Sequence, residues 1–569
     1  MKVNSKSAGF ITLTVILLSA FFFYFFTFNR YHLWHLEQNQ LFRYNKDYLL
    51  DFLQRPGGFI LLTGAFITRF FYNAWVAAIT ITFLAGSFFY ITSRILKYYQ
   101  LSYFLLSAIT VVILAALQSN HNYLPAYTLG WLFTITVFYG YILIPGLTYR
   151  HITGLILVPV LFYLCGFFSF LLVPLVIVHE LSIKGKKHYL FCLTMVITGM
   201  LMPVVFQRYV FLTPKETMWI IPLNPVLLKD KSVYIFLLPC YLVIIIASIP
   251  FIRKIKVTRM VLAISALLFL ISGFFIIREN YDKKNEVFLH IEASYQQSDY
   301  KQVLALGRKY PGNNQLVVYY TNLALSRLGE LSEKMFMFNQ SGSRGLWLQW
   351  SRNETAPLYG SEFYEIVGYT NEASRWAFEA MEINELNPRS LKKLIIASLI
   401  NEQPELASKY RYLLSQNSHY ASWSDDKKVA NGKKMKLTHD FISTGYHPYE
   451  LLELLEDHPD NRPAYEYLMA SFLLDKNLEM FASQIYRLKD LGYSHIPRYF
   501  EEAIILYSGL TGKDITPPGY TLSEQTMQRF HEYASLFAAN RYSMDKASKV
   551  LAKKFGDTFW YYMQFRNQK

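Results

Sequence analysis

A single arginine, Arg69, interrupts an otherwise apolar stretch between Phe59 and Ala77. A guanidinium at membrane depth is costly, and such a residue by default marks a functional site. The alternative is that the Arg69 side chain extends to the membrane interface beside Tyr72 and Asn73. The sequence therefore singles out Arg69 as a candidate binding residue and leaves both roles open.

Imidazole and carboxylate groups come together earlier in the chain, at His32, His35 and Glu37. These side chains are common ligands of transition metals, and His121 could join them if the fold brought it near. No further pair of ligands follows at a fixed spacing, so the sequence identifies no cofactor and leaves a divalent metal as an alternative. The cysteines lie inside apolar runs and indicate neither a disulfide framework nor a zinc motif. They are Cys165, Cys192 and Cys240.

These residues lie in or between apolar runs that must position them. The first run, 11–28, carries no charge and is long enough to cross a hydrocarbon core of about 30 Å. The candidate spans are roughly 10–28, 74–93, 101–118, 124–145, 152–178, 188–207, 233–252 and 259–277. The run 152–178 contains Pro159, Gly166 and Pro174 and predicts either one broken helix or a hairpin, and 58–68 predicts a short helix. We predict an all-α, polytopic transmembrane bundle of eight to ten spans over residues 1–279.

Charge is distributed unevenly along the chain. Residues 1–277 hold 21 Lys and Arg but only 6 Asp and Glu, whereas the remainder holds 35 of each. Because the second half shows no basic excess, we predict no nucleic-acid partner. Short basic connectors are typical of the cytoplasmic side of membrane proteins. They are 94–97, 184–187 and 253–259.

This charge rule predicts the orientation of the helices. The connector 118–123 has no Lys or Arg and should lie outside, together with the longer loops 29–57 and 208–232. Keeping the basic connectors on one side requires either that 152–178 cross twice or that a short helix supply the missing pass. We predict a multi-pass protein of the inner (cytoplasmic) membrane, with a cytoplasmic N-terminus and an extracytoplasmic C-terminal domain over 280–569.

The loop 29–57 contains an amphipathic pattern. Its apolar side chains recur at helical spacing, at Leu41, Tyr44, Tyr48 and Phe52. The opposite face is polar and holds Arg43, Asp47, Asp51 and Gln54. This predicts a helix lying in the membrane interface, which the sequence Pro56-Gly57-Gly58 ends.

A long outer loop after the first helix, with acidic residues and an interfacial helix, resembles the GT-C superfamily of membrane glycosyltransferases. So does the continuation Arg55-Pro56-Gly57-Gly58-Phe59, followed by a Phe- and Tyr-rich turn and the next span. Members of that superfamily take a sugar from a polyprenyl phosphate carrier on the outer face. The resemblance covers about residues 10–100. The usual paired acidic motif is absent, because Glu37 is followed by Gln38 and Asn39.

The resemblance implies roles for residues of the outer loop. An acidic residue just after the first helix is commonly the catalytic base, which implies Glu37 here, with Asp47 and Asp51 as weaker candidates. The alternative is that Glu37 is a solvated loop carboxylate. Transfer from a lipid phosphate also needs cations that hold the phosphate. The candidates are Arg43, Arg55, Arg69 and Arg208.

From about residue 280 the pattern changes to paired helices separated by short turns. The units are 293–314, 316–338, 368–380, 397–414 and 463–488. Their spacing is close to the roughly 34 residues of tetratricopeptide-type repeats, which they resemble. We predict a TPR-like α-solenoid with a surface for a protein or glycan partner. The layout as a whole also resembles polytopic membrane proteins of Bacteroidetes that carry a helical-repeat tail.

Two classes of function fit these patterns. The first is a GT-C-like transferase that uses a polyprenyl-phosphate-linked sugar in the cell envelope. The alternative is a non-enzymatic, membrane-anchored scaffold for envelope proteins. A transporter ranks third, because several spans contain Pro or Gly but no intramembrane acidic pair supports ion coupling. The sequence contains no phosphate-binding Gly-rich loop, dinucleotide fingerprint or Gly-x-Ser-x-Gly motif.

Overall fold

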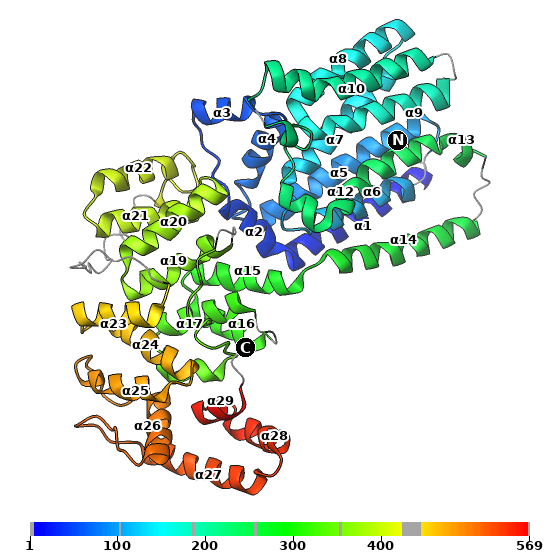
Figure 1. The fold of residues 1–569 in the computed structure, drawn as a ribbon. Helices are drawn as coiled ribbons and strands as arrows, with labels where there is room; N and C mark the ends of the chain where they lie inside the picture. Colours follow the sequence, from blue (N-terminus) through cyan, green and yellow to red (C-terminus); the bar gives the residue numbers. More distant parts are fainter. Residues whose placement is uncertain are drawn as a thin grey trace. The chain divides into compact units, whose positions relative to one another are not determined.

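The computed structural model describes residues 5–101, 104–184, 188–212, 214–254, 259–310, 312, 314–351, 355–423 and 445–566. Regular structure in these ranges is helical, apart from one isolated bridge between Ser341 and Ser343. The internal contacts divide the chain into two compact units (Figure 1). Unit 1 is Met1–Glu286 and unit 2 is Val287–Lys569.

Unit 1 is a bundle of apolar helices and short connecting helices. They are α1 (Ser5–Phe28), α2 (Arg30–Gln38), α3 (Lys46–Leu53), α4 (Gly58–Thr68), α5 (Ala74–Tyr98), α6 (Phe104–Gln118), α7 (Pro125–Leu143), α8 (Leu147–Cys165), the 3-10 helix η1 (Gly166–Leu171), α9 (Leu172–Lys184), α10 (Tyr189–Tyr209), α11 (Lys215–Met218), α12 (Pro225–Ala247), α13 (Ile249–Ile252) and α14 (Arg259–Asn280).

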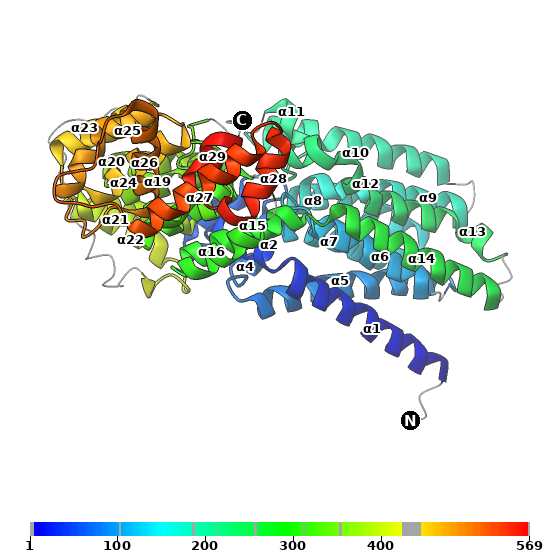
Figure 2. The ribbon, with the colours of Figure 1, turned by 90° about the horizontal axis from the view of Figure 1, so that it is seen from below.

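Among the described residues, six helical segments are long and apolar enough to cross a membrane, and three further apolar helices are shorter. The shorter ones lie at 58–68, 104–118 and 234–247. Only 11% of the apolar windows of α1 and α14 is buried inside the unit, and Figure 2 shows α1 at the edge of the bundle. Helices that leave so many apolar side chains uncovered need a lipid environment. These features confirm an all-α membrane protein, whereas the number of spans stays a prediction.

The run 152–178 forms two antiparallel helices and not one broken helix. Arg150 on α8 and Glu180 on α9 are thirty residues apart in sequence, yet their side chains lie 2.8 Å apart. A straight helix would separate them by about 45 Å. The turn is made at Gly166, whose φ of +57° suits glycine, and continues through η1.

The connectors of unit 1 gather at two ends, which we call the loop end and the far end. Residues 29–57, 118–124 and 281–286 meet at the loop end, as the Tyr24–Ser119 and Tyr31–Glu286 hydrogen bonds show. At the far end, Arg253 donates to the carbonyl of Tyr99. The basic residues at 94–97 and 253–254 therefore lie at the same end. The middle of the third basic connector, 185–187, falls outside the described residues.

The predicted interfacial helix is shorter than its sequence pattern. It is α3, Lys46–Leu53, so Leu41, Arg43 and Tyr44 precede it. The side chain of Asn45 accepts a hydrogen bond from the Asp47 N–H at 2.8 Å and caps the helix, which fixes its start. A further helix, α2, precedes α3, and the sequence pattern did not predict it.

Unit 2 consists of helices that mostly pack on their neighbours in sequence. They are α15 (Lys283–Gln296, which begins in unit 1), α16 (Tyr300–Lys309), α17 (Gln315–Arg327), α18 (Leu331–Lys334), η3 (Met335–Met337), α19 (Thr355–Val367), α20 (Thr370–Asn384), α21 (Pro388–Ile400), α22 (Pro404–Ser415), α23 (His447–Asp457), α24 (Arg462–Leu474), α25 (Leu478–Gln484), η6 (Ile485–Lys489), α26 (Arg498–Thr511), α27 (Glu524–Asn540), α28 (Met544–Phe555) and α29 (Phe559–Phe565).

The predicted turns between paired helices are present. Ser298, Glu402 and Lys476 each adopt a left-handed conformation at such a turn, and Asp299 and Asn477 cap the helices that follow. In addition, α18 contacts α24 and α26, which are distant in sequence. The helix pairs are thus confirmed, and the solenoid and its resemblance to tetratricopeptide repeats stay predictions. The sequence also predicts a polar loop between repeat blocks at 420–437, and most of that segment lies outside the described residues.

A buried ion network joins three helices of unit 2. Arg389 on α21 donates to Glu292 on α15 and to Glu362 on α19, the latter at 3.0 Å. Lys393 donates to Glu362 at 2.8 Å and to Glu365 at 2.6 Å. The cations hold the pKa of Glu362 at about 2, against the effect of burial. These charges are tolerated inside the protein only because each has partners.

We expect Arg389→Ala, in residues 287–569 expressed as a separate protein, to lower the free energy of unfolding by about 3–5 kcal/mol. The variant leaves the buried carboxylates of Glu292 and Glu362 with too few cations. The measurement is urea unfolding followed by circular dichroism. The matched control is Arg375→Ala, which removes an arginine from a partly exposed pair with Glu372 and should cost about 1 kcal/mol or less. Equal losses in the two variants would contradict the structural role of the network.

Candidate functional site

At the loop end, α2 begins against the carboxylate of Glu286. The N–H groups of Tyr31 and His32 donate to Glu286 Oε1 and Oε2 at 2.7 and 3.0 Å. A carboxylate in this position satisfies N–H groups that lack partners within the helix and interacts well with the helix dipole. Burial nevertheless raises the pKa of Glu286 to about 7, with the two N–H groups acting in the opposite direction.

Two histidines from distant parts of the sequence meet beside this contact. The Nδ1 atoms of His32, on α2, and His121, in the connector after α6, lie 2.9 Å apart. Burial lowers the pKa of His32 well below its usual value, and the neighbouring His121 and His35 lower it further. His32 is therefore neutral at neutral pH. The two rings share one hydrogen bond, in which one nitrogen donates and the other accepts.

The structure brings together only part of the metal site considered from the sequence. His121 joins His32, whereas the His35 Nε2 atom lies 2.8 Å from the Asn39 amide nitrogen. In the ranges that the structure describes, no set of three His, Cys, Asp or Glu ligands includes these histidines. His32 and His121 therefore form a hydrogen-bonded pair.

The three candidate carboxylates occupy different environments. Glu37, in the last turn of α2, is 1% exposed, and its Oε2 accepts a hydrogen bond from the Gln38 side chain at 2.6 Å. Asp47 and Asp51 are exposed on α3. Asp51 accepts from Arg55 at 2.7 Å in a pair that is about half exposed on both sides. Glu37 is thus the only one of the three that lies inside the protein, where a base would be shielded from water.

Arg69 lies directly after α4, among four aromatic rings. Its guanidinium carbon lies 4.3–5.6 Å from the ring centroids of Phe42, Tyr44, Phe66 and Phe70, and it donates a hydrogen bond to the Tyr44 hydroxyl. Within the described part of the chain, no carboxylate lies within ion-pair distance of Arg69. Rings attract the faces of a guanidinium, so its in-plane N–H groups stay available to an anion.

A second arginine adjoins these rings. The Arg43 guanidinium lies 4.8 Å from the ring of Tyr48, which packs edge-on against Phe42. Arg43 likewise has no ion-pair partner among the described carboxylates, and its buried Nε atom makes no hydrogen bond. We call Arg43, Arg69 and the rings between them the arginine–aromatic cluster. Of the other two cations, Arg55 is paired with Asp51, and Arg208 is exposed at the end of α10 beside Tyr209.

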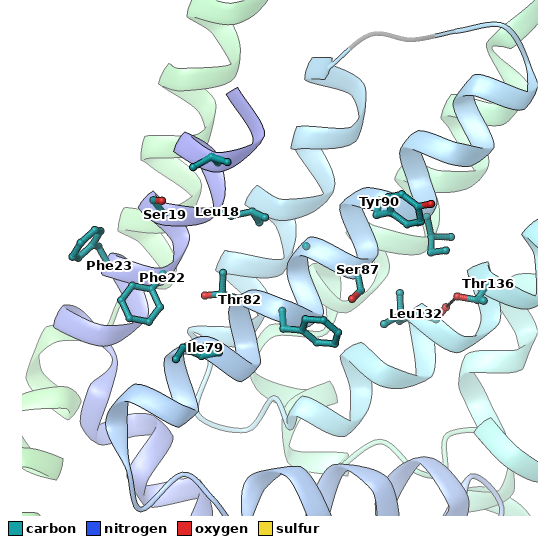
Figure 3. A pocket seen from close by; sticks show the side chains of 14 residues that line it. Leu18, Ser19, Phe22, Phe23, Ile79, Thr82, Ser87, Tyr90, Leu132 and Thr136 are labelled. Carbon is teal, nitrogen blue, oxygen red and sulfur yellow. Dashed lines mark hydrogen bonds between the residues drawn. The ribbon is translucent and has the colours of Figure 1, made fainter. Parts of the chain in front are cut away.

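A wide-open apolar cavity of about 840 Å³ lies between α1, α5 and α7 (Figure 3), and lining side chains such as Phe23 and Ile79 are exposed. Its walls are mainly hydrocarbon and aromatic side chains, with a few hydroxyl groups. Figure 3 shows Phe22 and Phe23 on α1, Ile79 on α5 and Leu132 on α7 among them. All three helices are candidate membrane spans, so the cavity lies at membrane depth. Its chemistry suits a hydrocarbon chain and not a charged group.

Comparison with known proteins identifies the family but no solved relative. The model of a family described as a "family of unknown function (DUF6057)" matches residues 5–566, so the chain belongs to that family. No curated protein and no solved structure matches the chain.

Sequence reasoning missed two participants at the loop end. Glu286 falls within the predicted C-terminal domain 280–569, and its contact with α2 joins residues more than 250 positions apart. The Phe42 ring was not considered, because Leu41 and Tyr44 carried the helical pattern. The absence of Lys and Arg around His121 was a usable signal, since it placed that connector at the same end as the loop 29–57.

We expect Glu286 to make the stability of unit 1 depend on pH. Its pKa is about 7 in the folded protein and about 4.5 in the unfolded chain, so folding favours the protonated form. Its stabilising contribution is present below about pH 4.5 and is lost as the pH rises through about 7.

Glu286→Gln removes this titration. The free energy of unfolding of the wild-type protein in detergent should therefore fall, relative to that of the variant, by on the order of 3 kcal/mol between about pH 5 and pH 8. The measurement is the melting temperature of both proteins across this range, which should fall for the wild type relative to the variant. Glu279→Gln, an exposed glutamate on the preceding helix, is the control. A constant difference between the wild type and Glu286→Gln across this range would contradict the assignment.

Proposed function

We propose that this DUF6057 family member is a cell-envelope membrane enzyme of GT-C type that binds a polyprenyl-phosphate-linked sugar at the loop end and transfers the sugar. The observation that carries the proposal is the arginine–aromatic cluster. Arg43 and Arg69 are held by rings and not by carboxylates, so two positive charges remain available to an anion beside an apolar helix bundle.

The donor groups of the cluster suit a phosphate. The rings of Phe66 and Phe70 contact the guanidinium of Arg69 and fix its position without neutralising it. A phosphate can then accept two parallel N–H bonds from the in-plane edge, which is the strong bidentate geometry of arginine. Arg69 also follows the C-terminus of α4, where the helix dipole stabilises a cation and helps to keep it charged.

The apolar cavity supports a lipid as the carrier of that phosphate. It is lined by α5, which begins shortly after Arg69, and by α1 and α7. A hydrocarbon chain at this depth would replace bilayer lipid in the cavity, while its phosphate lay at the level of the loop end. A soluble nucleotide sugar would leave the cavity unused.

Glu37 is the base in this proposal. It lies inside the protein, and a carboxylate in a water-poor site is a more effective proton acceptor than one in solvent. The Gln38 amide donates to Oε2 and orients the group. Because Glu37 is 1% exposed, an acceptor reaches it only when α2 shifts, which makes the loop 29–57 a mobile cover of the site in this proposal.

The same proposal includes the orientation of the helices. Basic residues at 94–97 and 253–254 lie at the far end, and the arginine–aromatic cluster lies at the loop end. The charge rule then directs the far end to the cytoplasm and the loop end outward in the inner membrane. Because α14 runs towards the loop end, unit 2 would emerge on the outer side.

A non-enzymatic scaffold is the second candidate, and two observations favour it. The only described ion pair of Arg55 is with Asp51, and Glu37 is buried and hydrogen bonded, as residues that only support the loop would be. In that case the lipid-facing helices anchor unit 2, whose surface binds an envelope protein or glycan.

Substitutions at the loop end separate phosphate binding from transfer. Arg69→Gln should weaken binding of polyprenyl phosphate to the purified protein by roughly 10–100-fold, because one charge-assisted hydrogen-bonding group is lost. Glu37→Gln should leave this binding intact and lower sugar transfer in membranes by about 10²–10⁴-fold. The control is Arg278→Gln, an exposed arginine near the same end of the bundle. If both variants bind and transfer like the wild type, the scaffold remains.

We expect unit 2 to be accessible from outside the cytoplasmic membrane. A cysteine introduced by Ser408→Cys, at an exposed position of α22, should react with a membrane-impermeant thiol reagent in intact spheroplasts. The unsubstituted protein measures the background from the three native cysteines. Labelling of Ser408→Cys only after lysis would reverse the orientation and place the loop end in the cytoplasm.

A further inference from the structure

A second cluster of chemically active side chains lies at the far end of unit 1, away from the loop end. Glu180 on α9 is fully buried, and two imidazoles from different helices approach it. His151 comes from the first turns of α8, and His188 directly precedes α10. The ligand atoms of these three residues all lie within 4.8 Å of one another. In the described part of the chain, this is the one set of three His, Cys, Asp or Glu ligands so close together.

The Glu180 carboxylate is oriented by groups behind it. Its Oε1 accepts hydrogen bonds from Arg150 Nε at 2.8 Å and from the Tyr141 hydroxyl at 3.0 Å. Its Oε2 faces His151 Nε2 at 3.6 Å and His188 Nδ1 at 4.0 Å, with Arg150 Nη2 at 3.2 Å. Arg150 thus holds both oxygens of the carboxylate, and Oε2 also points between the two imidazoles. Metal sites commonly hold their carboxylate ligands in this way.

The imidazoles are also held in place. The His151 ring stacks on Phe191, with centroids 3.8 Å apart and planes 7° from parallel, and stands edge-on to the His188 ring at 5.3 Å. His151 Nε2 is buried and makes no hydrogen bond. A buried nitrogen aimed at a carboxylate, but too far from it for a hydrogen bond, loses the energy of one contact. A bound cation would satisfy it.

The cluster adjoins a cavity of about 550 Å³ that both histidines line. Leu190, Phe191 and Thr194 form part of its wall. Glu180 lies behind the histidines, so an ion entering from the cavity meets three protein ligands on one side and open space on the other. This is the arrangement of a site with three protein ligands and an exchangeable fourth position.

We propose that His151, Glu180 and His188 bind one divalent transition-metal ion, with zinc as the best match to two imidazoles and a carboxylate. Zinc takes such ligands at about 2.0–2.2 Å in a tetrahedron, so the ligand atoms must draw together by about an ångström. The binding atoms are His151 Nε2, Glu180 Oε2 and His188 Nδ1, and water completes the set from the cavity. Magnesium and calcium, which prefer oxygen ligands, fit less well.

Arg150 sets the strength of this site. Its positive charge already offsets that of Glu180, so the metal gains less from the carboxylate than it would beside an unpaired one. Arg150 also holds Glu180 in position when the metal is absent. The site is therefore expected to exchange its metal and to be emptied by a chelator. This inference is independent of the proposed transferase activity.

Metal content of the purified full-length protein tests the proposal. The protein is prepared in detergent with an affinity tag that contains no histidine run, stripped with a chelator, dialysed against zinc and measured by elemental mass spectrometry. The expected result is one zinc per wild-type chain, and at least about tenfold weaker zinc binding for both His151→Ala and His188→Ala. The matched control is His531→Ala, which removes an exposed histidine of unit 2 and should bind as the wild type does.

Thermal stability supplies a second measurement that does not depend on activity. Zinc should raise the melting temperature of the wild type and of His531→Ala, but not that of His188→Ala. If His151→Ala fails to fold because its stacking on Phe191 is lost, His188→Ala and the effect of zinc on the wild type decide the matter. Zinc content that is equal in the wild type and His188→Ala would overturn the proposal, as would a wild type that binds none. In either case the histidines would serve only as partners of Glu180.

Discussion

The ion pair between Arg150 and Glu180 holds unit 1 together at its far end. Taking both charges out of water costs several kcal/mol, which only close geometry and additional hydrogen bonds offset. The pair has both, because two N–H groups of Arg150 and the hydroxyl of Tyr141 reach the same carboxylate. It closes α8 and α9 into a hairpin and ties that hairpin to α7. This closure decides at which end of the bundle every later connector of unit 1 lies. The orientation of the whole bundle therefore depends on it as well.

The sequence predicted the elements of unit 1 far better than it predicted their contacts. Hydropathy located most of the long apolar helices within a few residues, because a lipid environment imposes one long apolar run on each, whereas α12 begins at Pro225 and not near 233. It missed α2, whose buried face includes His32 and Glu37 and therefore shows no apolar stripe. The meeting of His32 with His121, and of Arg150 with Glu180, could not be read from spacing, since both contacts depend on how helices pack. Glu180 precedes the basic connector 184–187 in sequence, and nothing in that position indicates that it would be buried.

Both units bury charge, and they do so for different physical reasons. In unit 2, Arg389 and Lys393 neutralise carboxylates from several helices, so the buried charges balance within the protein. In unit 1, Arg43 and Arg69 are held by rings, and His151 Nε2 makes no hydrogen bond although it lies 3.6 Å from Glu180. A network in which every charge has a partner holds its helices in place, whereas a cation or a buried nitrogen atom without such a partner leaves a position that an added ligand can occupy. That contrast is why both candidate sites lie in unit 1.

The two sites in unit 1 cannot take part in one chemical step. At the loop end, the Tyr163 carbonyl of α8 accepts from the N–H of Gly57, whereas at the far end the same helix presents Arg150 to Glu180. Thirteen residues of helix separate these contacts, about 20 Å at 1.5 Å per residue. A metal beside Glu180 is too far from a phosphate at Arg69 to polarise it. Coupling between the two ends would require α5, α7 or α8 to shift as a rigid body. At the far end, the tight packing of Gly154 against Tyr141 and Phe191 opposes such a shift. The far-end site therefore acts on its own side of the bundle.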